Sequence, residues 1–132
     1  MSRIASRIAF FSALILSVLS CSEPLSTEKF IQNTDGRYSF EVDMTHTDCS
    51  YDLFFYSRVD SWKKVPEFPI DLVWTSPSGA RYSERVYFVR DGHDKVAYRT
   101  GLVPEESGVW TLDARADAEG LRGLGLICRR VY

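Results

Sequence analysis

The sequence predicts an all-β protein folded as an antiparallel two-sheet β-sandwich. In several segments apolar and polar residues alternate with a period of two, as in strands with one buried face. Turn-forming Gly, Pro, Asp and Ser residues separate these segments roughly every 8–14 residues, and no segment has the apolar spacing of an amphipathic helix. Seven strands are expected, which favours an immunoglobulin-like sandwich. The jelly roll, which usually has eight strands, is the alternative.

Residues 1–20 have the order of a secretory signal that precedes a lipidated cysteine. Arg3 and Arg7 supply positive charge, and an apolar run over residues 8–19 follows. That run is too short to span a bilayer core of about 30 Å. The junction at Cys21 resembles a bacterial lipoprotein signal, in which the peptidase cuts before a cysteine that becomes lipidated. We therefore expect a lipoprotein signal peptide at 1–20 and acyl chains on Cys21, with an ordinary signal beside an unmodified cysteine as the alternative.

The residue after the cysteine bears on the destination of the protein. Ser22, rather than Asp, stands there. Under the sorting rule of many Gram-negative bacteria this permits transport to the outer membrane. Each buried CH₂ contributes about 0.8 kcal/mol, so two or three acyl chains anchor firmly. We expect a lipid-anchored envelope protein in the outer membrane and leave the leaflet open.

The chain after the signal divides into a linker and one domain. Residues 21–36 are expected to be the lipidated cysteine and a flexible tether, because they are rich in Ser, Thr, Glu and Asn and contain Pro24. The turn at Asp35-Gly36 opens the folded part, so the β-sandwich domain occupies 37–132. Without residues 1–20, the chain has 14 basic and 18 acidic side chains and a formal charge of −4. This charge argues against a nucleic-acid partner and against attraction to anionic headgroups.

The alternation also indicates which side chains are buried. Arg37–Met44 alternates cleanly, whereas Tyr51–Val59 is apolar on both faces, as expected of a central strand. Trp74 and Trp110 are in phase with apolar neighbours, so we expect them in the core. The remaining expected strands are Phe68–Thr75, Ala80–Val89, Lys95–Val103, Val109–Ala116 and Leu121–Val131.

Two cysteines remain if Cys21 carries lipid. Cys49 and Cys128 would then lie in an oxidising compartment, where cysteines commonly pair. A bridge closing a loop of about 80 residues would stabilise the fold by about 4–5 kcal/mol on the chain-entropy model. Two buried free thiols are the alternative. The sequence leaves both open.

The sequence contains no recognisable catalytic or metal-binding motif, and we expect neither enzymatic activity nor a cofactor. His46 and His93 fall in expected loops, and a zinc site would have to combine them with Cys49 and Asp94 without the paired spacing of structural zinc sites. The Glu105-Glu106 pair is expected to be solvated in a turn, because glycosidase carboxylates flank a cleft instead. No G-x-S-x-G, H-E-x-x-H or Gly-rich phosphate motif is present.

Aromatic residues are the remaining candidates for contact with a partner. They make up 14% of the chain. Trp62, in an expected loop, and Tyr56 are the residues we expect to be exposed and to touch a partner. Exposed aromatic rings would suit a glycan, so a surface carbohydrate-binding lipoprotein is one candidate function.

The order of motifs resembles the gliding motility lipoprotein family GldH. The resemblance covers roughly residues 37–130 and implies a single β-sandwich domain without catalytic residues. It also implies a non-catalytic interaction or structural component of a cell-envelope assembly, with other envelope proteins as partners, and we prefer this function over glycan binding. The motifs are F-x-V (Phe40, Val42), Y-D-L-x-x-x-x-R (Tyr51 to Arg58), P-x-x-P-I-D-L-x-W (Pro66 to Trp74), P-x-G (Pro77, Gly79), G-V-W-T-L-x-A-R (Gly108 to Arg115) and G-L-x-G-L-G-L (Gly120 to Leu126).

Overall fold

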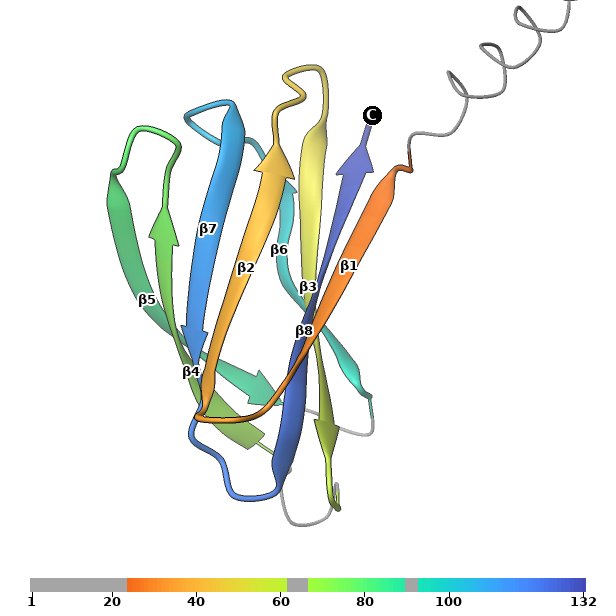
Figure 1. Cartoon of the computed structure of the whole chain (residues 1–132). Helices are drawn as coiled ribbons and strands as arrows, with labels where there is room; N and C mark the ends of the chain where they lie inside the picture. Colours follow the sequence, from red (N-terminus) through yellow and green to blue (C-terminus); the bar gives the residue numbers. More distant parts are fainter. Residues whose placement is uncertain (1–23, 62–66, 90–92) are drawn as a thin grey trace, which may run out of the picture.

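The regular structure of the described chain consists of β-strands arranged in two packed sheets. A computed structural model of the protein describes residues 24–61, 67–89 and 93–132. Within these residues no helix is long and apolar enough to cross a membrane. The predicted all-β sandwich is confirmed (Figure 1). The strands are β1 (Ser26–Gln32), β2 (Arg37–Met44), β3 (Ser50–Val59), β4 (Glu67–Thr75), β5 (Arg81–Val89), β6 (Lys95–Leu102), β7 (Gly108–Arg115) and β8 (Leu121–Val131).

The strand order is that of a jelly roll. The first sheet has the order β1-β8-β3-β6 and the second sheet the order β2-β7-β4-β5, with antiparallel pairing throughout. Among these strands, β4 and β5 are the one consecutive pair that shares a sheet, and every other connection crosses to the opposite sheet. In an immunoglobulin-like sandwich the first two strands are neighbours in one sheet. The immunoglobulin-like expectation is therefore wrong, and the jelly-roll alternative describes the chain.

Part of the expected tether is a strand. Residues 26–32 pair with β8 along their whole length, from Ser26 opposite Arg129 to Gln32 opposite Gly123. Their side chains are exposed or half-buried, so this edge strand lacks the apolar alternation that reveals the others. This strand is held mainly by backbone hydrogen bonds to β8 and not by burial of its side chains. The tether expected over 21–36 is thus wrong for residues 26–32.

The seven strands predicted from alternation are confirmed, and their ends agree with the prediction to within one residue. β3 lies between β8 and β6, as expected of a central strand. Its neighbours are not β2 and β4, the strands adjacent to it in sequence, but β8 and β6.

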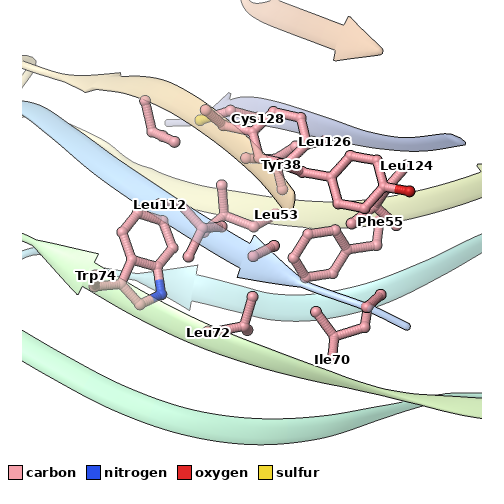
Figure 2. Packing of buried hydrophobic residues seen from close by; sticks show 14 of the residues in the cluster. Tyr38, Leu53, Phe55, Ile70, Leu72, Trp74, Leu112, Leu124, Leu126 and Cys128 are labelled. Carbon is pink, nitrogen blue, oxygen red and sulfur yellow. The ribbon is translucent and has the colours of Figure 1, made fainter. Parts of the chain in front are cut away.

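The core lies between the sheets and follows the period of two. Figure 2 shows Leu53 and Phe55 of β3 near Leu72 of β4, and all three side chains are at most 2% exposed. Trp74 and Trp110 are 9% and 6% exposed, which confirms them as core residues. Burial of one such large apolar side chain contributes about 1.5–3 kcal/mol.

Candidate binding cleft

A cleft of about 330 Å³ lies where the edge strands β5 and β6 face each other across the sandwich. We call it the β5–β6 cleft. Strand β5 contributes Tyr82 and Glu84, and β6 contributes Tyr98 and Arg99. The buried ring of Trp110 and the loop after β6 complete its walls. Its volume falls in the range of about 300–1,000 Å³ that small-ligand sites occupy.

Four aromatic rings follow one another around this cleft. The rings of Tyr98 and Trp74 are nearly parallel, with centroids 6.4 Å apart. Trp74 meets Trp110 edge to face at 6.1 Å, and Trp110 lies 6.2 Å from Tyr82. Tyr82 is 45% exposed, so its ring is accessible to a ligand, whereas the two tryptophans are anchored in the core.

A hydrogen-bonded polar cluster holds the Tyr98 side of the cleft in place. Trp74 Nε1 donates to the Tyr98 hydroxyl at 2.9 Å, and that hydroxyl donates to the carboxylate of Glu84. Arg99 Nη2 donates to the other oxygen of Glu84 at 2.7 Å. Burial, and then the hydrogen bond to Glu84, raise the pKa of Tyr98 to about 12. The hydroxyl therefore stays protonated at neutral pH and serves as a fixed donor.

The adjacent acids Glu105 and Glu106 point to different partners. Glu105 accepts a hydrogen bond from the Tyr82 hydroxyl at 3.2 Å. Glu106 accepts two bonds from Ser78, from the backbone N–H at 3.1 Å and from Oγ at 2.8 Å. Hydrogen bonds from the hydroxyls of Ser76 and then Ser78 lower the pKa of Glu106. Glu106 thus joins two loops, and Glu105 faces the cleft.

Tyr56 lies on the outer face of the first sheet, away from the β5–β6 cleft. It is half-buried, and its ring covers Gly125 so closely that a Cβ atom there would lie 2.1 Å from it. The ring also stacks on Phe30, with centroids 5.8 Å apart. Trp62 and Cys21 lie outside the described residues.

Cys49 and Cys128 are not joined by a disulfide bond in the structure, and Cys49 is half-buried whereas Cys128 is buried. Cys128 is 9% exposed on the inner face of β8. Burial, with smaller contributions from Asp43 and Cys49, raises the pKa of its thiol to about 11. At neutral pH this thiol is protonated and behaves as a small apolar side chain.

The two histidines lie at opposite ends of the sandwich. His46 precedes β3, and its Nε2 is 2.9 Å from Arg130 Nη1. His93 is exposed just before β6, which pairs with the far end of β3. The four residues considered for a zinc site, His46, Cys49, His93 and Asp94, are therefore not brought together by the fold. Within residues 24–61, 67–89 and 93–132, no three His, Cys, Asp or Glu side chains are grouped to hold a metal ion.

Sequence reasoning missed the cleft residues on β5 and β6. The sequence of β5 does contain an indication of the cleft. Glu84 alternates with the apolar residues Val86 and Phe88 and therefore points to the same, inner side of the strand. A carboxylate in that phase indicates a polar opening in the core. The sequence holds no such signal that β5 and β6, which lie in different sheets, face each other.

Comparison of the sequence with protein-family models finds no match, and comparison with curated proteins finds none either.

Proposed function

We propose that this chain is a non-catalytic, lipid-anchored protein of the bacterial cell envelope whose jelly roll binds a carbohydrate in the β5–β6 cleft. The observation that supports it is the combination of accessible aromatic surface with fixed polar groups in one cleft. The flat ring of Tyr82 offers a face for the apolar side of a sugar. Glu84 and Arg99, with side chains 30% and 51% exposed, offer an acceptor and a donor for hydroxyl groups.

The polar groups are positioned before any ligand arrives. Glu84 is held by both Tyr98 and Arg99, and Tyr98 is held by Trp74. Groups that are already ordered lose little conformational freedom when a ligand binds, which favours affinity. The Tyr98 hydroxyl donates its one proton to Glu84, so it orients that carboxylate toward the cleft, and its raised pKa makes it unsuited to act as a base. These properties favour binding over catalysis.

Titration calorimetry of residues 22–132 with purified envelope polysaccharide fragments tests this function. We expect Tyr82→Ala to weaken binding about tenfold, which corresponds to about 1.4 kcal/mol. Tyr87→Ala is the matched control, because Tyr87 is 59% exposed on the same strand and does not line the cleft. The proposal is contradicted if no fragment binds, or if both variants weaken binding equally.

A second candidate function is that of an interaction component of an envelope assembly, in line with the resemblance to the GldH family. The outer face of the first sheet favours it. There Lys95 Nζ lies 4.4 Å from the ring centroid of Phe54, and Arg129 covers the same ring at 5.5 Å. Arg58 lies 5.2 Å from the centroid of Phe30. Aromatic and arginine side chains are enriched in protein interfaces.

Mild crosslinking of the tagged, anchored protein followed by affinity purification separates the two functions. If the outer face binds envelope proteins, Phe54→Asp abolishes their co-purification and Tyr82→Ala leaves it intact. The opposite pattern, or no stable co-purification, rejects the assembly function. The glycan function is judged independently by the calorimetry.

A further inference from the structure

One end of the sandwich carries exposed apolar side chains beside the start of β1. Leu25, Val131 and Tyr132 are 57%, 39% and 66% exposed. They lie at the same end of the first sheet, because the backbone N–H of Arg130 donates to the carbonyl of Leu25 at 2.8 Å and Val131 and Tyr132 follow Arg130 in the chain. The strand register places the side chains of Leu25 and Val131 on opposite faces of the sheet at this end. Figure 1 shows the start of β1 and the end of β8 at this same end. We call these three side chains the end patch.

The end patch is close in the chain to the proposed anchor. Pro24 is attached to β8, because its carbonyl accepts a hydrogen bond from Arg130 Nη2 at 2.7 Å. Three residues of chain span at most about 11 Å, which bounds the separation between the Cα atoms of Cys21 and Pro24. Acyl chains on Cys21 would therefore hold this end within about 11 Å of the residue that enters the bilayer.

We propose that the end patch rests on the bilayer and that the membrane interface is its partner. This inference rests on lipidation of Cys21 in the proposed function. Tyr132 suits the interface, since tyrosine is enriched where the headgroups meet the acyl chains. Its hydroxyl accepts a hydrogen bond from Arg130 Nη1 at 3.0 Å, and the guanidinium lies 5.9 Å from its ring centroid.

The contact is apolar and interfacial rather than a matter of net charge. The chain after residue 20 has a formal charge of −4, so attraction to anionic headgroups does not drive it. Contact of three apolar side chains is weak by itself, and the anchor makes it effective by holding the patch at the surface. The acyl chains would supply the affinity, and the end patch would set the orientation of the domain.

Depth-dependent quenching tests the inference on the full lipidated protein. The protein is reconstituted in phosphatidylethanolamine–phosphatidylglycerol vesicles that contain a phospholipid with a nitroxide near the top of its acyl chain. Tyr132→Trp is compared with Tyr87→Trp, a matched control because Tyr87 is 59% exposed near the start of the paired strand β4, at the opposite end. We expect the tryptophan added at position 132 to be quenched at least twice as strongly as the one added at 87.

Two outcomes are to be distinguished by measuring the mass of the N-terminal peptide in the same sample. If Cys21 is acylated and the two added tryptophans are quenched equally, the end patch does not contact the bilayer and the anchor stands. If Cys21 carries no acyl group, both the anchor and this inference are overturned. Coverage of the patch by a second copy of the chain would give protection from aqueous iodide without nitroxide quenching, and it would also overturn the inference.

Discussion

Two glycines of β8 determine what can lie on the outer face of the first sheet. Because Gly123 and Gly125 have no side chain, the rings of Phe30 and Tyr56 lie flat over the strand, each within 2.1 Å of where a Cβ would be. The rings then stack on each other across β8. The G-L-G-L pattern thus has a physical reason, in which the leucines face the core and the glycines make room for aromatic rings on the other side.

Gly125→Ala should destabilise the protein by about 1 kcal/mol, because the new methyl group would displace the Tyr56 ring from the strand. In a Tyr56→Ala background the same substitution should cost close to nothing. Chemical denaturation of the four proteins of this double-mutant cycle measures the difference. Equal costs of Gly125→Ala in both backgrounds would show that the ring does not lie over the glycine.

The raised pKa of Cys128 makes a part of the stability depend on pH. Its pKa rises from 9.0 to about 11, chiefly through burial, so the folded state holds this proton more tightly than the unfolded state. The contribution is complete below pH 9 and is lost as the pH rises through about 11. We expect the free energy of unfolding of the wild type, relative to Cys128→Ala, to decline between those values. A constant difference across this range would show that the thiol is solvated.

At the scale of elements, the predictable strands are those with one buried face. β2 is the clearest case, since every second side chain from Tyr38 to Met44 is at most 2% exposed. β1 could not be predicted because its inward side chains are only partly covered, with Ile31 half-buried against the core. Alternation of apolar and polar residues indicates that one face of a strand is buried. An edge strand such as β1 is instead held largely by its hydrogen bonds to one neighbour, so it can lack this alternation. The polar composition of residues 26–32 therefore indicated a tether.

Hydrogen exchange distinguishes the strand from a tether. Roughly half of the amides in an edge strand point toward the neighbour and bond to it. We expect amides of Ser26–Gln32 to exchange at least about tenfold more slowly than in the unfolded chain. Mass spectrometry of peptides from residues 22–132 makes the measurement. Exchange at the rate of the unfolded chain across this segment would show that it is a flexible tether and not a strand.

At the scale of the whole molecule, topology is what the sequence left undetermined. Missing β1 gave a count of seven strands, and that count pointed to the immunoglobulin-like order. The same gap concealed the β5–β6 cleft, whose walls come from strands consecutive in sequence but in opposite sheets. Trp74 and Trp110 were correctly placed in the core, yet their role as the inner wall of the cleft depends on which strands face them.

Because the chain crosses between the sheets at nearly every connection, neither sheet can form without the other. We therefore expect residues 22–132 to unfold in a single transition. Far-UV circular dichroism, which reports backbone structure, and near-UV circular dichroism, which reports aromatic packing, should give the same midpoint in urea. Separate midpoints would show that one sheet persists after the other has opened.

The pairing of β1 with β8 has a consequence for the timing of folding. Ser26 pairs with Arg129, 103 positions later, and β8 also separates β1 from β3. The first sheet therefore cannot be completed until β8 has been synthesised, and such distant pairings fold slowly. During synthesis the nascent chain therefore lacks a complete first sheet. That delay suits a protein that we propose is exported as an unfolded thread and folds only after crossing the membrane.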